Sequence, residues 1–242
     1  MQAKWPPVSL GLRLKDELTM PEGDCFPAFA LGVFMRHLLL FALLLGCAVP
    51  AWANTSLAPQ VGRDYLVLKN PVSVTSDKIE VRQFFSYRCW TCYQQSVVLQ
   101  PFLKTLPKDV RFVRTALPSS GSGGNDELKV YYALEQMQVA DRVHLSLLKN
   151  SGVRGREALT PKAITAVMLA NGVYTDRFNK LYDSPVVISR IRAGANLAHK
   201  LGIQKVPAVV VNGKYLVIGK SENTNRTIRH LIAVERQLAA SP

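Results

Sequence analysis

The chain has 242 residues, which is long enough to bury a hydrophobic core without metal ions or disulfide bonds to hold it. Hydrophobic residues make up 48% and charged residues 19%, a composition that excludes disordered, collagen-like and polytopic membrane proteins. Thirty Lys and Arg residues against seventeen Asp and Glu residues give a net charge of +13. That charge is compatible with nucleic-acid binding, an anionic membrane surface or a soluble basic protein, and by itself it selects none of them.

The N-terminal region predicts export. Residues 38–45 form an apolar run that follows Arg36 and is too short to span a bilayer, and they are followed by Pro50 and an Ala-Trp-Ala sequence ending at Ala53. This order is typical of a secretory signal peptide. We therefore expect residues 35–53 to be a signal peptide that is cleaved after about Ala53.

Two upstream features leave alternatives open. Residues 1–34 contain four acidic residues, which is unusual at the start of a signal peptide, so we expect them to be a misassigned start or an N-terminal extension. The Leu-Leu-Gly-Cys sequence that ends at Cys47 resembles a bacterial lipobox. A lipoprotein anchored at Cys47 is therefore the alternative to a soluble exported protein.

The cysteine count excludes a disulfide-dense scaffold, because the chain has only four. Cys25 and Cys47 precede the predicted cleavage site. The exported chain would thus carry only Cys89 and Cys92, in an oxidising compartment.

In chain order, the first part of the exported sequence predicts a β-α-β unit. Residues 65–68 and 79–85 are typical of strands, 89–106 of a helix kinked at Pro101, and 110–114 of a further strand. The two cysteines fall at the start of this helix. Its buried face is predicted to contain Tyr93, Val97, Pro101 or Phe102, and Leu106.

The second part predicts a helical region followed by a hairpin and a last helix. Residues 118–124 are a Ser/Gly-rich breaker, and helix-type patterning covers 126–201. Strands over 208–211 and 215–218 flank an Asn-Gly pair, a strong hairpin signal, and a helix over 224–239 closes the chain. The helical region is expected to be interrupted at Ser151-Gly152, Asn171-Gly172 and Ser184-Pro185.

The spacing of Cys89 and Cys92 favours a redox-active dithiol. A cysteine in the first turn of a helix lies beside unpaired N–H groups and the positive end of the helix dipole, which favour the thiolate. Arg88 adds a full positive charge next to it. The thiolate is the nucleophile of disulfide exchange, and Cys92, one turn further on, is placed to attack the resulting mixed disulfide.

Three other interpretations of the two cysteines are weaker. A disulfide that closes a loop of two residues would contribute little stability. Half a zinc site needs two more ligands, and His144, His199 and His230 lie apart, without metal-ligand spacing. A redox-silent binding module does not account for both cysteines. The sequence therefore predicts neither a metal nor a cofactor.

Two motifs carry a resemblance to a known family. Residues 84–94 read FFSYRCWTCYQ and residues 202–215 read GIQKVPAVVVNGKY, with weaker support from residues 62–65 and from the Asn-Gly pair at 171–172. The sequence resembles the DsbA-type periplasmic thiol:disulfide oxidoreductases over about residues 62–238. The resemblance implies an α/β protein, with a thioredoxin fold and an inserted α-helical domain.

The resemblance also implies how the domains are divided. Residues 54–124 and 201–242 would form the two parts of the thioredoxin-like domain. Residues 125–200 would form the inserted helical domain. No segment remains for the dimerisation domain that isomerase relatives carry, so we expect a monomer.

The site implied by the resemblance has two sides. Cys89 would be the exposed nucleophile and Cys92 its buried partner, and Val206 and Pro207 would form a cis-proline loop that faces them. Valine before this proline resembles the oxidase branch of the family. From the residues alone, a trans proline opening a strand remains open. The backbone of Val206 is a candidate for pairing with an extended substrate segment.

Two departures from the family's best-known members concern redox strength. Trp90 and Thr91 stand between the cysteines where those members have Pro-His, and Thr91 offers one hydrogen bond but no charge. Gln83 stands where those members often place a buried acid near the second cysteine. Together with Arg88, these residues are expected to tune the reduction potential and not to change the reaction type.

The resemblance thus implies a periplasmic oxidase that donates disulfide bonds to unfolded secreted proteins and is reoxidised by a quinone-linked membrane oxidase of the DsbB type. The alternatives are a reductase or isomerase kept reduced by a DsbD-like donor, and a non-catalytic chaperone that uses the groove beside Pro207. Nucleic-acid binding is not expected, because no basic cluster is interleaved with aromatic residues and the chain is predicted to be exported.

Overall fold

The structure is a computed structural model that describes residues 58–118, 125–154, 160–219 and 221–241. The predicted signal peptide, the upstream segment, Cys47 and nearly all of the predicted Ser/Gly-rich breaker lie outside these residues. Within the described part, no helix is long and apolar enough to cross a membrane.

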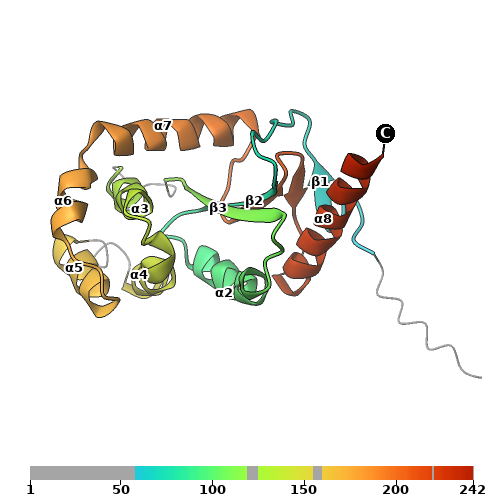
Figure 1. The fold of residues 1–242 in the computed structure, drawn as a ribbon. Helices are drawn as coiled ribbons and strands as arrows, with labels where there is room; N and C mark the ends of the chain where they lie inside the picture. Colours follow the sequence, from blue (N-terminus) through green and yellow to red (C-terminus); the bar gives the residue numbers. More distant parts are fainter. Residues whose placement is uncertain (1–57, 119–124, 155–159, 220, 242) are drawn as a thin grey trace, which may run out of the picture. The chain divides into compact units, whose positions relative to one another are not determined.

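A five-stranded mixed sheet forms the centre of the described chain (Figure 1). Its strands are β1 (Tyr65–Val67), β2 (Ile79–Phe85), β3 (Val110–Ala116), β4 (Ala208–Val211) and β5 (Tyr215–Val217). They lie in the order β1-β5-β4-β2-β3. The pair β2–β3 is parallel and the other neighbouring pairs are antiparallel.

Strand β2 lies in the interior of the sheet, with both of its edges paired and both of its faces covered. Its side chains Val81 and Phe84 have no exposed surface and belong to core clusters on opposite faces. The β-branched and aromatic residues of its sequence, IEVRQFF, are typical of a strand, and its bounds agree with the predicted 79–85. The end of β2 leads directly into the two cysteines.

Two helices, α2 (Trp90–Lys104) and α8 (Thr224–Ala240), cover one face of the sheet. Leu99 and Phe102 of α2 pack with Ile228 of α8 in a single buried cluster. On the opposite face, helix α7 (Pro185–Lys200) contributes to the cluster that contains Phe84.

The buried face of α2 agrees with the prediction at Phe102 and differs from it at Val97. The fully or almost fully buried residues are Cys92, Ser96, Leu99 and Phe102, whereas Val97 is 45% exposed. Apolar periodicity misplaced this face because a polar residue, Ser96, occupies a core position, where its hydroxyl accepts a hydrogen bond from Gln83. Pro101 lies inside the helix, as expected, but the helix ends at Lys104 and not at residue 106.

A helical region lies between β3 and β4 in the sequence (Figure 1). Its helices are α3 (Asp126–Gln136), α4 (Ala140–Arg154), α5 (Pro161–Ala170), α6 (Asp176–Tyr182) and α7. Their apolar side chains form one core cluster, and that cluster also contains Phe85, Tyr87 and Cys92. The second cysteine is therefore packed against the helical region.

One of the predicted interruptions of this region is wrong and two are confirmed. Helix α4 continues through Ser151, whose buried hydroxyl donates to the Leu147 carbonyl of its own helix and to the Tyr87 carbonyl. These acceptors let a helix contain a serine that the sequence pattern treats as a breaker. Helix α5 ends before Asn171, and Ser184 caps the start of α7.

The predicted hairpin is confirmed. Asn212 and Gly213 both have positive φ, 49° and 65°, as the tight turn between two antiparallel strands requires. Strand β3 continues two residues beyond its predicted end, to Ala116.

Candidate functional site

Cys89 is the N-cap of helix α2. Its backbone is extended, with φ −107° and ψ 107°, and its sulfur accepts a hydrogen bond from the Cys92 N–H at 3.2 Å. A cap side chain usually supplies an oxygen to the orphan N–H groups of the first turn, and here a sulfur takes that place. The predicted position at the helix start is therefore confirmed, with Cys89 just outside the first helical residue, Trp90.

Two further groups approach the Cys89 sulfur. The hydroxyl oxygen of Thr91 lies 3.1 Å from it, and the carbonyl oxygen of Val206 lies 3.8 Å from it. Val206 is 117 residues away in the sequence. The fold thus brings the cysteine motif and the loop before β4 together, as the resemblance implied.

The surroundings of Cys89 lower its pKa to about 6, and the Val206 carbonyl is not among the causes. The largest cause is a hydrogen bond from the Cys92 thiol; burial opposes it, and the Thr91 hydroxyl and the backbone N–H groups of Cys92 and Thr91 add to it. Arg88 is not among these causes. At neutral pH the structure therefore favours a thiolate at Cys89, held by hydrogen bonds.

Cys92 has the opposite properties. It has no exposed surface, and its pKa is raised, first by its hydrogen bond to Cys89, then by burial, and further by the negative charges of Cys89 and Glu127. A backbone hydrogen bond from Ser86 acts in the other direction. The reduced pair is thus arranged to carry one negative charge, on the outer sulfur. No disulfide joins the two cysteines in this structure, so the site is in its reduced form.

The loop that faces the cysteines contains a cis peptide bond between Val206 and Pro207, as expected. Both residues are partly exposed, and Pro207 directly precedes β4. Their exposed backbone therefore lies on the surface next to Cys89.

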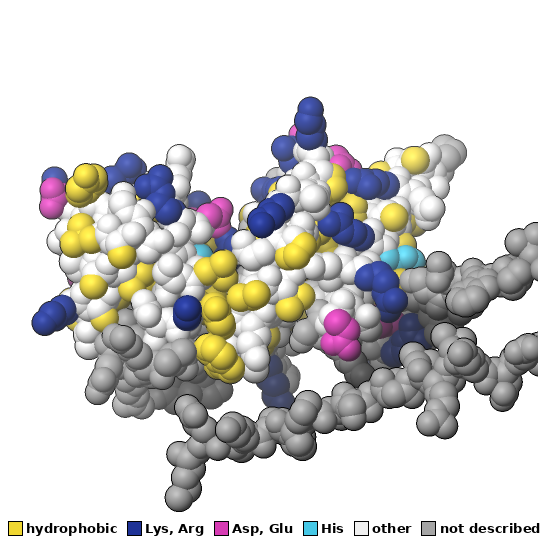
Figure 2. Space-filling view, turned by 90° about the horizontal axis from the view of Figure 1, so that it is seen from below, with side chains coloured by type: hydrophobic (Ala, Val, Ile, Leu, Met, Phe, Trp, Pro, Cys, Tyr) yellow, Lys and Arg dark blue, Asp and Glu magenta, His cyan; other side chains and the backbone are white. Residues whose placement is uncertain are grey.

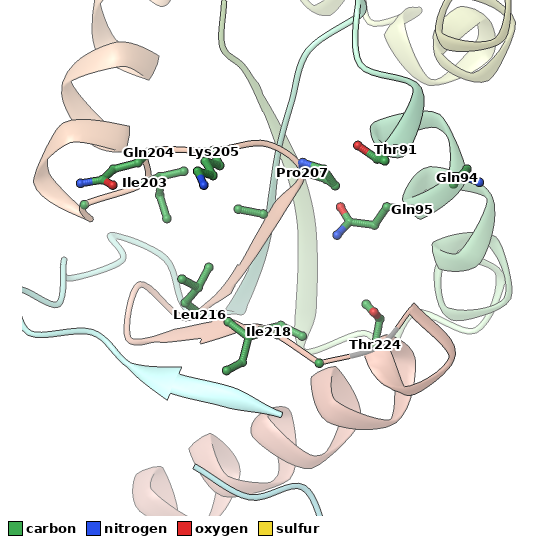
Figure 3. A pocket seen from close by; sticks show the side chains of 14 residues that line it. Thr91, Gln94, Gln95, Ile203, Gln204, Lys205, Pro207, Leu216, Ile218 and Thr224 are labelled. Carbon is green, nitrogen blue, oxygen red and sulfur yellow. The ribbon is translucent and has the colours of Figure 1, made fainter. Parts of the chain in front are cut away.

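A pocket of about 500 Å³ opens beside this loop (Figure 3). Thr91 and Gln95 of α2 face Pro207 across it, and Leu216 and Ile218 line its far end. Thr91 lies between the two cysteines, and Pro207 follows Val206, whose carbonyl approaches Cys89, so the pocket adjoins the surroundings of Cys89. Its lining is mixed, and the remaining wall comes from the loop containing Ile203, Gln204 and Lys205.

The surface around α2 is partly apolar. Trp90 is 43% exposed, and its ring stacks on Tyr93 with the centroids 5.0 Å apart. Figure 2 shows apolar side chains gathered toward the middle of the face on which α2 lies, with Lys and Arg at several separated places around them. An exposed aromatic ring next to a reactive cysteine is suited to contact with a partner protein.

Arg88 and Gln83, which were expected to tune the reduction potential, have hydrogen-bond partners other than the two cysteine sulfurs. The Arg88 backbone N–H donates to the Ser86 hydroxyl, and its Nε is buried without a hydrogen-bond partner. The Gln83 amide donates to Gln95 and to Ser96, and within the described residues to neither cysteine. Gln83 therefore supports the packing of α2 on β2.

Two residues near Cys92 were missed by the sequence analysis. Ser86 is fully buried, and its hydroxyl donates to Glu127 at 2.7 Å. Glu127 is 2% exposed and lies in the first turn of α3. A glutamate 35 residues after Cys92, in a helix without a motif, gives no local signal of proximity, and only the packing of α3 brings it to the site.

The three histidines that were weighed as zinc ligands lie in three different helices. His144 lies in α4, His199 in α7 and His230 in α8. His144 is buried, and desolvation lowers its pKa well below its usual value. Among the described residues, no group of three or more His, Cys, Asp or Glu side chains is arranged to hold a metal ion.

Similarity to known proteins covers most of the chain. The family model described as a DSBA-like thioredoxin domain matches residues 120–225. The thiol:disulfide interchange protein DsbA of Azotobacter vinelandii is 34% identical over 212 residues, which cover 84% of this chain and 99% of that protein. The protein of the same name from Pseudomonas aeruginosa is 31% identical over 211 residues, covering 85% and 99%.

The similarity extends to the three-dimensional structure. The crystal structure of Pseudomonas aeruginosa DsbA superposes with a TM-score of 0.66 at 31% identity, covering 75% of this chain and 97% of that one. This agreement confirms the predicted fold class, a mixed α/β thioredoxin fold with an inserted helical domain.

Proposed function

The chain belongs to the DsbA family of thiol:disulfide oxidoreductases, and we propose that its Cys89-Trp90-Thr91-Cys92 sequence is the redox centre that donates disulfide bonds to secreted folding proteins. The observation that carries the proposal is the contrast between the two sulfurs. Cys89 is partly exposed with a lowered pKa, and Cys92 is buried with a raised one.

The reaction begins with the pair in its disulfide form. A substrate thiolate attacks the Cys89 sulfur, the bond between the two cysteines breaks, and a bond between the substrate sulfur and Cys89 forms. The electron pair of the broken bond goes to Cys92, which takes up a proton because its pKa is raised. The product is a mixed disulfide on the outer sulfur.

A second substrate thiolate then attacks the substrate sulfur of the mixed disulfide. The substrate leaves with its own disulfide, and Cys89 leaves as a thiolate. A thiol of low pKa is a good leaving group, so the hydrogen bonds that lower the pKa of Cys89 to about 6 favour this step. Overall, the substrate loses two electrons and the cysteine pair gains them.

We propose that the substrate binds as an extended segment along the loop at Val206 and Pro207. The Val206 carbonyl lies 3.8 Å from the Cys89 sulfur, so a strand that pairs with this backbone would carry its cysteine to the reactive atom. Backbone pairing supplies affinity without sequence choice, as a general oxidase needs. The adjoining pocket and the exposed Trp90 ring offer apolar surface to flanking residues.

The cellular setting remains a proposal derived from the sequence. We propose that residues 35–53 direct export, that the protein acts in the periplasm as a monomer, and that a membrane oxidase of the DsbB type restores the disulfide. The domain limits at 54–124, 125–200 and 201–242 belong to the same proposal.

The deciding experiment measures the redox state of Cys89 and Cys92 in cells by thiol alkylation after acid quenching. A predominantly oxidised pair supports the oxidase. A predominantly reduced pair supports the reductase or isomerase and contradicts the proposal. Cys89→Ser separates both from a chaperone, because an oxidoreductase loses its activity and a chaperone that uses the groove beside Pro207 keeps it.

A further inference from the structure

Ser86 connects the two cysteines to the helical region. Its carbonyl oxygen accepts the Cys89 N–H at 3.2 Å, and its own backbone forms a hydrogen bond to the Cys92 sulfur. Its hydroxyl accepts the Arg88 N–H at 3.1 Å and donates to the Glu127 carboxylate at 2.7 Å. One fully buried serine therefore contacts the backbone of the redox motif and a carboxylate from α3.

Glu127 is held in the same buried environment as Cys92. It is 2% exposed, and the next residue, Leu128, belongs to the core cluster that contains Cys92. In such an environment, charges interact more strongly than they do in water. The negative charge of Glu127 is accordingly one of the causes that raise the pKa of Cys92.

Several ionisable groups on the elements around α3 have partners of their own. Gln83, on β2, is uncharged and bonded to Gln95 and Ser96. Three of the charged pairs in the described part of the chain are Arg114 of β3 with Asp141 of α4, Lys129 of α3 with Asp183 after α6, and Glu135 of α3 with Arg190 of α7. His144 of α4 is kept neutral, because burial lowers its pKa.

We propose that Glu127 is a positioning residue that makes the cysteine pair less oxidising, by placing a carboxylate beside a pair that gains one negative charge on reduction. This inference rests on the proposed function of Cys89 and Cys92. The sequence pattern gave the inserted helical region no role in tuning the reduction potential. This inference gives it one.

The direction of the effect follows from the charge balance. Reduction adds two electrons to the disulfide, Cys92 takes up one proton, and Cys89 remains a thiolate at neutral pH. The reduced form thus has one more negative charge near Glu127 than the disulfide form. Repulsion from the carboxylate disfavours the reduced form, and removing the carboxylate charge should favour it.

The test compares Glu127→Gln with Asp126→Asn, which removes an exposed charge from the neighbouring position of the same helix. Each protein is equilibrated with glutathione buffers at about pH 7, and the fraction reduced is measured by alkylation. Glu127→Gln should shift the equilibrium constant about tenfold toward the reduced protein, which is about 30 mV for a two-electron couple. Asp126→Asn should stay within about twofold of wild type, since its charge is exposed and screened.

The pH dependence distinguishes a charge effect from a packing effect. At about pH 4.5 the Cys89 thiolate is largely protonated, since the pKa of Cys89 is about 6, so the difference between Glu127→Gln and wild type should largely disappear. Glu127→Asp, which keeps the charge, should restore most of the wild-type value at neutral pH. If Glu127→Gln does not fold, the equally neutral Glu127→Met replaces it.

Two results would overturn the inference. One is a neutral variant with the wild-type equilibrium constant at both pH values, and the other is a shift of the same size at both. A failure of the proposed function appears differently, because the wild-type pair would then not exchange with glutathione.

Discussion

The sulfur of Cys89 and the hydroxyl oxygen of Thr91 lie 3.1 Å apart. The Thr91 hydroxyl is one of the groups that lower the pKa of Cys89, although it carries no charge. The residues between the two cysteines therefore affect the stability of the thiolate through a hydrogen bond. Since that thiolate exists only in the reduced protein, the same bond affects the reduction potential.

The first prediction concerns position 91. Thr91→Ala removes one neutral hydrogen bond, worth about 1 kcal/mol, and should raise the pKa of Cys89 by about 0.7 units and lower the reduction potential by about 20 mV. Thr91→Ser keeps the hydroxyl and is the matched control. Equilibration with glutathione measures the potential of each variant.

The opposite change at the same position is Thr91→His. A charge-assisted hydrogen bond is about 1–2 kcal/mol stronger than a neutral one, so this variant should be about 20–40 mV more oxidising than wild type. By the same reasoning, wild type should be more reducing than a family member with Pro-His between its cysteines. An unchanged potential in Thr91→His would show that the dipeptide does not set it.

The second prediction is the titration of Cys89. Ultraviolet absorbance of the thiolate in the reduced protein should report a pKa of about 6, and Cys92 should stay protonated throughout the neutral range because its pKa is raised. Cys92→Ser keeps Cys89 as the sole thiol of the described chain and assigns the transition to it. A transition at or above about 8.5, the value of a free cysteine, would refute the activated nucleophile.

The third prediction tests the role that the sequence assigned to Arg88. Since Arg88 is not among the groups that lower the pKa of Cys89, Arg88→Gln should change that pKa by less than about half a unit. Arg88→Lys controls for lost packing. A rise of about one unit or more in Arg88→Gln alone would restore the charge argument made from the sequence.

The fourth prediction links redox state to stability and pH. The pKa of Cys89 is lower in the folded reduced protein than in the unfolded chain, so the thiolate stabilises the reduced fold at pH values above the unfolded pKa. That stabilisation is lost as the pH falls through about 6. The oxidised protein has no such contribution.

Denaturant unfolding of both redox forms measures this link. The stability of the reduced form relative to the oxidised form should decrease when the pH is lowered from about 8 to about 5. A relative stability that does not change with pH over this range would contradict the hydrogen-bonded thiolate.

The parts of the fold that were predicted are those with local signals. The buried strand β2, the Asn212-Gly213 turn and the cysteines at the start of α2 follow from short patterns, and the structure has all three. The buried face of α2 was misplaced, because Ser96 occupies a core position through its hydrogen bond with Gln83.

The surroundings of Cys92 depend on contacts between distant segments. Glu127 reaches Ser86 across 41 positions in the sequence, and no motif marks Glu127 as part of the site. The contribution of Thr91 was expected, whereas the Cys92 thiol, the largest cause of the lowered pKa of Cys89, acts through a geometry that spacing alone does not specify.

The most direct test of the central claim, that Cys89 receives the substrate thiol and Cys92 completes the pair, is the trapping of mixed disulfides in cells. Cys92→Ser cannot form the disulfide between the two cysteines, so its Cys89 thiolate reacts with disulfides of secreted proteins, and the resulting adducts should accumulate as reductant-sensitive bands after alkylation, because Cys92 is absent and cannot displace the bound protein. Cys89→Ser should accumulate none, since Cys92 has no exposed surface. Adducts of equal amount in both variants, or adducts in Cys89→Ser alone, would contradict the account.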